Sequence, residues 1–297
     1  MLVIRYAVDN DSFAGVRTGN EVRRFPGTEL AELLRLPAAG FRAEVERVAA
    51  QGPVEDREIR LLPPVDGLTE VWASGVTYER SSAARQEESV VADVYSRVYD
   101  AERPELFFKS VAWRVVGTGE PIGIRTDSAI DVPEPELAVV VNAGGEIVGY
   151  TVCDDVSSRS IEGENPLYLP QAKVYAGCCA LGPGIRPFWE VDDAYALGVS
   201  AEVRRGGERV WDASTSTKML HRRLDDLVGY LGRQLALPDG AVLSTGTGIV
   251  PDLDFTLAVG DTVTVTVDGI GTRSNPVVAA SPAAFAWWQT GPARRWA

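Results

Sequence analysis

The sequence has few cysteines, no long apolar run and no excess of positive charge. Its three cysteines, Cys153, Cys178 and Cys179, form an odd set with two adjacent members, which argues against a disulfide framework and fits a reducing cytoplasm. No stretch approaches the roughly 20 apolar residues of a membrane-spanning helix. The N-terminus lacks the basic start and the long apolar segment of a signal peptide. We therefore expect a cytoplasmic protein without a membrane partner.

The charge balance excludes a further class of partner. The 297 residues carry 42 acidic and 29 basic side chains, and the formal net charge is −13 at pH 7. A surface of this sign repels nucleic acid and anionic lipids, so we expect neither as a partner. Charged residues make up 24% of the chain, as in ordinary globular proteins, and the length is sufficient for a substantial core.

The first part of the chain indicates a small domain of strands and helices. Residues 1–8 are a predicted strand, and helical spacing follows at 27–36 and 43–51. A closing strand within 57–65 ends at Pro63 and Pro64, because proline has no backbone N–H for a sheet. We place a small N-terminal domain at 1–65 and a larger domain at 66–297.

The larger domain is predicted to be rich in β-structure. A buried strand runs from Trp72 to Val76, and a helical pattern follows from about Ser81 to Tyr99. After an extended segment at 103–110, the alternation of side chains predicts strands near 135–142, 147–153, 196–204, 208–214 and 262–268. One further helix is expected over 217–235, from an apolar stripe of Leu220, Leu224, Leu227, Val228 and Leu231.

Two carboxylates begin a strand that otherwise looks buried. Glu134 and Glu136 share a face if residues 135–142 form a strand, because side chains alternate along it. If the following hairpin turn is centred on Gly144 and Gly145, Glu134 lies opposite Asp155. A slip of one residue would place Asp154 there instead.

Three carboxylates on one face are typical of a site for a hard divalent cation. Mg²⁺ or Mn²⁺ suits such oxygen ligands and Ca²⁺ is an alternative, whereas Zn²⁺ usually takes nitrogen or sulfur. From the spacing alone, an equally good interpretation is a pair of strand-edge glutamates that are solvated or matched to arginines. On this face Cys153 is expected to pack rather than to bind metal.

Four segments in order resemble the fumarylacetoacetate hydrolase superfamily. They are PEPELAVVV, GYTVCDDVSSRSIEGENPLYLPQAKVYAGCCALGP, STGTGIVP and GIGTRSNPV, and the resemblance covers most of residues 66–280. The segments GVTYERS, VYDAERPELFFK and ENPLYLPQAKVYAGCCA are most similar to its 2-keto-3-deoxy-D-arabinonate dehydratase branch. The resemblance implies an α+β fold, with a small N-terminal α/β domain and a C-terminal mixed β-sandwich or β-roll domain.

The resemblance also implies site residues and a homo-oligomer, either a dimer or a dimer of dimers. Glu134, Glu136 and Asp155 fall on the family's metal ligands, in agreement with the hairpin argument. Lys173 falls on its active-site lysine, and Glu105 on an acidic position near the substrate in the dehydratase branch. The helix after Tyr78 matches the segment that closes over the site.

Three departures from the family pattern bear on the reaction. No histidine follows the motif at 75–78, although hydrolase members commonly have one there to activate water. The sole histidine, His221, suits an exposed position far better than that of a general base. Ser160 and Ala176 stand where many relatives have aspartate, so the substrate stays open.

These residues favour a magnesium-dependent lyase that acts on a 2-keto acid. The substrate can chelate the cation through its carboxylate and keto oxygens, which stabilises an enolate and makes the C3 proton acidic. Loss of a C4 hydroxyl then dehydrates a 3-deoxy-2-keto sugar acid such as 2-keto-3-deoxy-D-arabinonate. Lys173 and Glu105 are candidates for base and acid, in either order, and a structural ion pair is an alternative for each.

Other functions and weaker site candidates stay open. The same enolate chemistry would serve C–C hydrolysis of an acylpyruvate or decarboxylation of a 2-keto acid, and a catalytically degenerate binding homologue is the non-enzymatic alternative. The missing histidine counts against hydrolysis. Six further residues are candidates for substrate binding: Ser74, Tyr78, Lys109, Arg159, Gln171 and Thr247.

Overall fold

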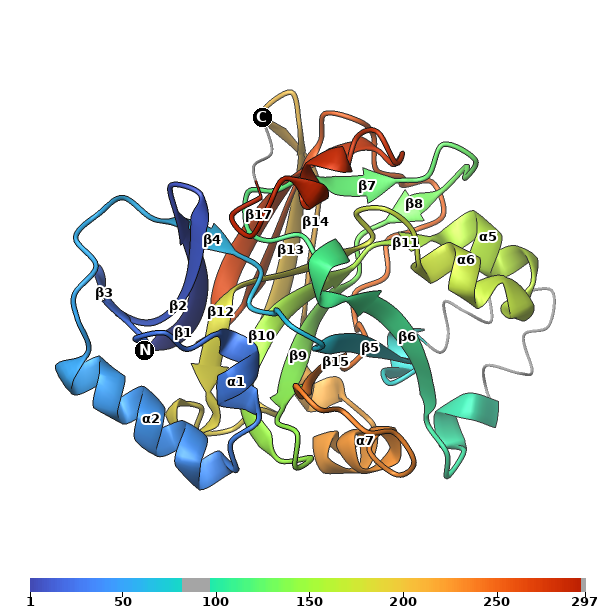
Figure 1. The fold of residues 1–297 in the computed structure, drawn as a ribbon. Helices are drawn as coiled ribbons and strands as arrows, with labels where there is room; N and C mark the ends of the chain where they lie inside the picture. The colour runs from blue at the N-terminus through green and yellow to red at the C-terminus, as the bar shows by residue number, and fades with distance from the viewer. Residues whose placement is uncertain (82–96, 295–297) are drawn as a thin grey trace.

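Two β-sheets packed face to face form the framework of the structure (Figure 1). The computed structural model describes residues 1–81 and 97–294. The larger sheet of this part has the order β3 (Glu21–Arg24), β2 (Asp11–Thr18), β1 (Leu2–Val8), β12 (Cys179–Pro187), β10 (Ile147–Asp155), β9 (Pro135–Val141), β15 (Ala241–Ser244), β5 (Glu70–Gly75) and β6 (Glu105–Val111), and β4 (Arg60–Leu62) pairs with β1.

A second sheet covers one face of the first. Its strands follow the order β14 (Glu208–Ser216), β13 (Gly198–Arg205), β16 (Thr262–Val267), β17 (Gly271–Ala279) and β7 (Ile122–Ile124). A short ribbon pairs β11 (Ser157–Ser158) with β8 (Asp131–Val132). The mixture of sheets with few helices confirms the predicted α+β class.

The helices lie around the sheets rather than between them (Figure 1). They are α1 (Leu30–Leu34), α2 (Ala38–Gln51), α5 (Arg159–Glu164), α6 (Leu169–Lys173) and α7 (Leu224–Leu231). In Figure 1, α1 and α2 lie beside the N-terminal strands, whereas α5 and α6 lie at the opposite side, near β6. Among the described helices, none has the length and apolar character needed to cross a membrane.

Burial on both faces explains the unbroken apolar run of β9. Leu137, Val139 and Val141 belong to the core between the two sheets. Ala138 and Val140 face the other way and join the core that includes side chains of α1 and α2. A strand covered on both faces loses the polar alternation of an exposed sheet. The side chain of Glu136 therefore lies on the same face of the sheet as Ala138 and Val140, where a charged group is unexpected.

The predicted strands are confirmed, but the helix predicted over 217–235 is wrong in extent. Only Leu224–Leu231 is α-helical, and Thr217–Met219 forms a 3₁₀ turn. The backbone before the helix bonds elsewhere: Leu220 pairs with Tyr78, and the His221 N–H donates to Thr77 O at 2.9 Å. Contacts with another segment override the apolar periodicity at this end. Of the helix predicted from about Ser81 to Tyr99, residues 82–96 lie outside the described part.

The N-terminal strands extend the same sheet that carries the later ones. Val3 of β1 pairs with Ile185 of β12, and β12 pairs with β10 on its other side. β12 was not predicted, because two glycines and two prolines hide its strand character. The domain boundary near residue 66 stays a prediction.

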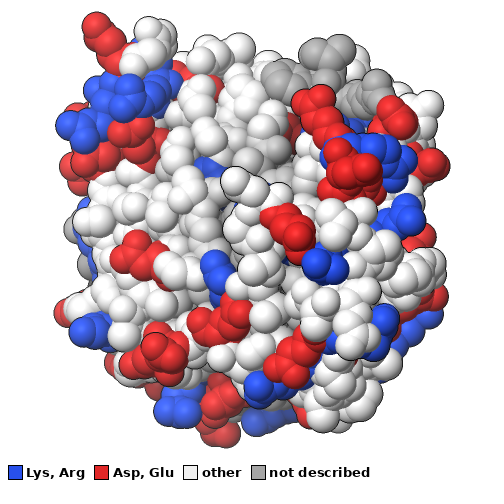
Figure 2. Space-filling model, turned by 90° about the vertical axis from the view of Figure 1, so that its left-hand side faces the viewer, with Lys and Arg blue, Asp and Glu red and all other residues white. Residues whose placement is uncertain are grey.

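Charged side chains are interspersed on the face shown in Figure 2, which is the left-hand side of Figure 1. Acidic and basic residues alternate over this face and large areas are neutral, so neither sign gathers into an extended patch there.

Candidate metal and catalytic site

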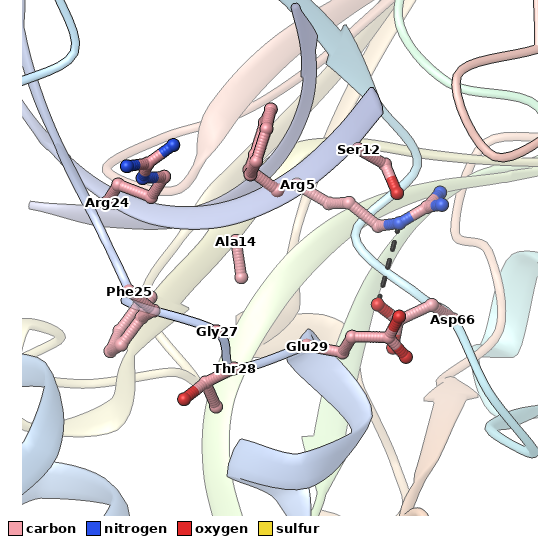
Figure 3. Close-up of a pocket in the computed structure, with 10 residues that line it drawn as sticks. Arg5, Ser12, Ala14, Arg24, Phe25, Gly27, Thr28, Glu29 and Asp66 are labelled. Carbon is pink, nitrogen blue, oxygen red and sulfur yellow. Dashed lines mark ion pairs between the residues drawn. The ribbon is translucent and has the colours of Figure 1, made fainter. Parts of the chain in front are cut away.

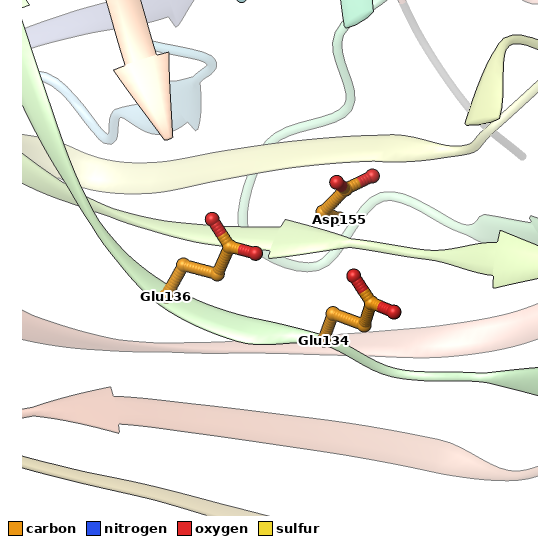
Figure 4. A group of neighbouring side chains, drawn as sticks. All are labelled: Glu134, Glu136 and Asp155. Atoms are coloured by element: carbon orange, nitrogen blue, oxygen red, sulfur yellow. The ribbon is translucent and has the colours of Figure 1, made fainter. Parts of the chain in front are cut away.

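The β9–β10 hairpin brings the predicted acidic residues together. Glu136 pairs with Cys153, and the Asp155 N–H donates to Glu134 O at 3.0 Å. The carboxylates of Glu134, Glu136 and Asp155 converge from the two strands (Figure 4). Asp155, rather than Asp154, joins the glutamates, so the register predicted from the sequence is confirmed.

The turn itself differs from the one assumed. The Asn142 N–H bonds to Glu146 O at 3.0 Å, which centres the turn on Gly144 alone. The pairing then shifts between Ile147 and Gly149, so Val148 is an extra residue in β10. This β-bulge restores the predicted pairing before the strands reach the acidic residues.

The three carboxylates form a buried cluster with the oxygen ligands of a hard cation. One oxygen from each lies within 4.8 Å of the others, and the residues are only 4%, 2% and 1% exposed. Glu136 Oε2 accepts hydrogen bonds from the Gly246 N–H at 2.7 Å and from the Ser244 hydroxyl. Burial, followed by the charge of Asp155, raises the pKa of Glu136 well above its usual range. A cation would relieve this repulsion.

Two buried lysines offset part of the negative charge. Lys173 Nζ lies 2.6 Å from Glu134 Oε2, 3.4 Å from Asp155 Oδ2 and 2.6 Å from the Ser157 hydroxyl. Lys109 forms an ion pair with Asp155 and donates to Val156 O at 3.1 Å and to Lys173 O at 2.6 Å. Lys109 therefore links a predicted ligand to the backbone of the predicted active-site lysine.

A small cavity lies against the cluster. Its volume of about 20 Å³ has room for one ion or one water molecule. Five acidic side chains line it, against the single cation of Lys173, among the residues described. The hard oxygen donors of Glu134, Glu136 and Asp155 fit a divalent cation such as Mg²⁺. The acidic residues are Glu105, Glu134, Glu136, Asp155 and Glu162.

Several of the other predicted site residues also border this cavity. Ser74, Glu105 and Thr247 line it. The Ser74 hydroxyl donates to Glu105 O at 2.9 Å, and the Thr247 hydroxyl donates to Pro135 O at 3.0 Å. A Cβ atom at Gly75 would lie 2.1 Å from Glu105 Oε2, so a larger residue there would displace this carboxylate from its present position. Three elements distant in sequence, β5, β6 and the segment after β15, thus meet at the predicted ligands.

Four predicted substrate-binding residues are not among the cavity's lining residues: Lys109, whose contacts are given above, and Tyr78, Arg159 and Gln171. Tyr78 is buried, and burial followed by the charge of Glu136 raises the pKa of its hydroxyl. Arg159 is buried and donates to Pro251 O. Gln171 is exposed, and its backbone carbonyl accepts from Arg125 at 3.0 Å. Their role in binding stays a prediction.

The sequence interpretation missed Glu162, which lies on α5. Glu162 is 4% exposed, and its Oε2 lies 3.9 Å from Lys173 Nζ. It stands in the quoted segment between Cys153 and Lys173, but α5 has only six residues and no clear apolar period. The one available signal was its place between two predicted site residues, Asp155 and Lys173.

The three residues named in the departures from the family pattern, His221, Ser160 and Ala176, are not among the cavity's lining residues. His221 is exposed and stacks on Tyr99, with ring centroids 4.3 Å apart. This agrees with the prediction of a surface histidine. Ser160 bonds to the Ser128 hydroxyl at 2.9 Å and accepts the Ala129 N–H at 3.1 Å, so it holds a neighbouring loop. Ala176 is half-buried and is not a lining residue.

A second cleft, of about 400 Å³, lies among the N-terminal elements (Figure 3). Arg5 reaches across it toward Asp66, and the nearest nitrogen–oxygen distance is 3.5 Å. Asp66 also accepts the backbone N–H groups of Leu30 and Ala31 at 3.2 and 2.6 Å, which fixes the start of α1. This cleft shares no lining residue with the acidic cavity.

Similarity to known proteins agrees with the predicted family. Residues 70–278 match the model of the fumarylacetoacetate (FAA) hydrolase C-terminal family. The chain is 50% identical over 244 residues to a probable 2-keto-3-deoxyxylonate dehydratase of Haloferax volcanii, covering 80% of this chain and 83% of that protein. It is 46% identical over 224 residues to the 2-dehydro-3-deoxy-D-arabinonate dehydratase of Saccharolobus solfataricus, covering 74% and 75%.

A solved structure extends the similarity to the fold. It is a 2-keto-3-deoxy-D-arabinonate dehydratase complexed with magnesium and 2,5-dioxopentanoate, with a TM-score of 0.82 and 36% identity. The alignment covers 94% of this chain and 99% of that one. Both the predicted superfamily and the predicted dehydratase branch are confirmed. On its sequence and its fold, the chain belongs to the fumarylacetoacetate hydrolase family.

Proposed function

We propose that the protein is a magnesium-dependent dehydratase of a 3-deoxy-2-keto sugar acid such as 2-keto-3-deoxy-D-arabinonate. The observation that carries this proposal is the buried cluster of Glu134, Glu136 and Asp155 beside Lys173. Two relatives at 46–50% identity are dehydratases of such acids. The solved structure with magnesium and 2,5-dioxopentanoate adds support from the fold.

The three clustered carboxylates would hold the cation, since their oxygens converge on one point and bear more charge than the lysines offset. Bound Mg²⁺ supplies Lewis-acid polarisation of the substrate's 2-keto group. Mn²⁺ is the expected substitute, and Ca²⁺ has similar ligand preferences. The cavity has room for an ion but not for a sugar acid, so side chains at its rim must move when the substrate enters.

The protein's own groups supply the proton transfers. Removal of a proton from C3 and loss of the C4 hydroxyl as water leave an enone with a C3=C4 double bond and a C5 alcohol. Transfer of a proton from C5 to the 2-keto oxygen then gives a dienol, which tautomerises to the 2-keto group and the C5 aldehyde of 2,5-dioxopentanoate. Lys173 and Glu105 both border the cavity, and we assign the base and the acid to this pair. Lys173 is held between Glu134 and the Ser157 hydroxyl, which fixes the position of its ammonium group.

The substrate's hydroxyl groups require polar partners at the rim. Ser74 and Thr247 present hydroxyls there, and the N–H of Gly246 shows that backbone also points into this region. We assign substrate contacts to these two residues first, and to Tyr78, Lys109, Arg159 and Gln171 only if they move on binding. The expected homodimer or dimer of dimers, and a cytoplasmic location, also belong to this proposal.

The test is a defined reaction with the purified protein. We expect Mg²⁺ and 2-keto-3-deoxy-D-arabinonate to give 2,5-dioxopentanoate, and we expect EDTA to abolish the product and added Mg²⁺ to restore it. Oxaloacetate and an acylpyruvate serve as parallel substrates. Carbon dioxide release or C–C cleavage in place of dehydration would overturn the proposal in favour of another reaction of the family. Light scattering during chromatography measures the oligomeric state.

A further inference from the structure

The predicted ligand Glu134 lies between two prolines, Pro133 and Pro135. Proline has no backbone N–H, so the N–H of Glu134 is the single donor of this tripeptide. Its carbonyl joins the strand ladder by accepting the Asp155 N–H at 3.0 Å. Its N–H donates to the side chain of Asp154 on β10, at 2.9 Å from Oδ1. A side chain therefore does what a backbone partner usually does in a sheet.

Asp154 lies on the opposite face of β10 from the acidic cluster. Its neighbours along that face, Val152 and Val156, belong to the core between the two sheets. There Asp154 is fully buried, and its Oδ2 lies 3.5 Å from Nη1 of the buried Arg273 on β17. The contact joins the hairpin that carries the acidic cluster to the second sheet.

Arg273 is itself held in place. It donates to the Asn275 side chain, whose amide nitrogen donates to Gly117 O at 2.7 Å and to Glu120 O at 2.6 Å. Side-chain hydrogen bonds and the Arg273–Asp154 ion pair thus connect the loop before β7, through β17, to the backbone of Glu134. The segment GIGTRSNPV, which includes Arg273 and Asn275, has no other assigned part in the site.

A gain in folding stability does not by itself explain why the chain buries the Asp154–Arg273 ion pair. Removing two charges from water is expensive, and apolar residues of similar volume often replace a buried ion pair without loss of stability. The geometry gives a better reason, because Asp154 holds the one donor that fixes the backbone of a predicted ligand. Groups that orient metal ligands typically change metal affinity about 10–100-fold when they are removed.

We propose that Asp154, held by Arg273, is a positioning residue that orients Glu134 for metal binding. The inference rests on the metal site of the proposed function. The positioning role depends on the Asp154 carboxylate oxygen that accepts the Glu134 N–H, and not on the charges of the Asp154–Arg273 pair. The effect on metal affinity should therefore follow the acceptor and not the ion pair.

A pair of double variants separates the acceptor from the charge. Asp154→Asn with Arg273→Met removes both charges but keeps an oxygen for the Glu134 N–H. Asp154→Leu with Arg273→Met removes the oxygen as well, with a side chain of the same branching and number of heavy atoms. Mn²⁺ binding to the full chain is measured by electron paramagnetic resonance and calorimetry. We expect affinity close to wild type for the first variant and about 10–100-fold weaker for the second.

Asp261→Ala is the matched control. Asp261 is also fully buried, pairs with Arg205 at 2.7 Å and accepts the Ala258 N–H at 2.8 Å, but does not line the acidic cavity. It should lower the melting temperature and leave Mn²⁺ affinity unchanged. If the Leu variant does not fold, Asp154→Ala replaces it, because alanine removes the acceptor without inserting a branched side chain.

The outcomes distinguish this inference from the proposed function. Equal Mn²⁺ affinity in the Asn and Leu variants, whether wild-type or weakened, overturns the positioning role while the metal site stands. An equal loss in Asp261→Ala overturns it too, because general destabilisation then explains the effect. If the wild-type chain does not bind Mn²⁺, the proposed metal site fails, and the inference fails with it.

Discussion

Asp154 and Asp155 are neighbours in sequence but face different electrostatic surroundings on the two sides of β10. Asp155 points toward two glutamates, and Lys173 and Lys109 offset only part of their combined charge. Asp154 faces one arginine in a balanced pair. Both aspartates are almost fully buried, so exposure does not separate them. The difference teaches that an excess of buried carboxylate, rather than burial of a charge, marks the place for a cation.

The largest expected effect comes from removing one of the three carboxylates in the cluster that contains Asp155. Glu136→Gln removes one predicted ligand, and we expect turnover to fall about ten-thousandfold, since metal polarisation is worth several kcal/mol. The metal-free variant should melt at a temperature no lower than wild type at neutral pH, because burial and the charge of Asp155 already disfavour this carboxylate. Dehydration assays and melting curves in EDTA measure the two effects. A structural role would appear as a large fall in the melting temperature.

The second prediction removes a positive charge from the acidic cluster, at Lys173, instead of a carboxylate. Lys173→Met should lower turnover about a thousandfold through loss of acid–base catalysis. Without metal it should also lose roughly 3 kcal/mol of stability, because the buried acids lose a partner. Added Mg²⁺ should then raise the melting temperature more than in wild type. The exposed Lys218→Met is the control, and an equal Mg²⁺ shift in Lys173→Met and wild type would contradict the prediction.

A smaller effect is expected at Glu162, which contacts the lysine but is not in the cluster of three. Glu162→Gln weakens the hold on Lys173, and we expect kcat to fall about tenfold, equivalent to roughly 1.4 kcal/mol. Mn²⁺ affinity should be unchanged. The neighbouring Glu164 is exposed on the same helix, so Glu164→Gln is a matched control and should leave both quantities at wild-type values. Weaker Mn²⁺ binding in Glu162→Gln would make it a ligand instead.

The last prediction concerns stability rather than turnover, at another buried acid, Asp131, which has neither a cation site nor a close ion pair among the residues described. Burial raises its pKa to about 6. The Asp131 carboxyl group therefore binds its proton more tightly in the folded state than in the unfolded chain. The stability that this protonated group contributes is fully present below about pH 4 and is lost as the pH rises through 6.

Asp131→Asn should avoid that loss. We expect the variant to be more stable than wild type by roughly 1–3 kcal/mol at pH 8 and similar to it at pH 4. Denaturant unfolding at both pH values measures this difference. Equal destabilisation at both would show instead that the hydrogen bond from the Arg125 N–H, at 3.4 Å, requires a carboxylate.

The hairpin was the most predictable part of the site. The period of two along β9 and the pairing across a short turn select Glu134, Glu136 and Asp155 because both are local properties. Even there the turn centre was wrong, and the bulge at Val148 compensated for it. Lys173 and Glu105 were identified through the family resemblance, since no local pattern connects β6 or α6 with the hairpin.

Glu162, Asp154 and Arg273 had no comparable signal. Each acts through a partner far from it in sequence or on the opposite face of the sheet. The helix predicted over 217–235 was wrong near Leu220 for a related reason. The backbone of Leu220 pairs with Tyr78 instead of continuing the helix. Contacts with partners so distant in the chain do not produce a periodic pattern of residues in the sequence.

The sequence by itself determined the two-sided burial of β9, the carboxylate face of the hairpin and the family, because side-chain alternation and ordered motifs depend on neighbours along the chain. Only the tertiary structure decided how the lysines distribute over the three acids, where Glu162 lies, and that Asp154 holds the backbone of Glu134. Those features arise where separate strands meet. Electrostatic balance in a buried site depends on distances between such strands, which sequence spacing does not fix.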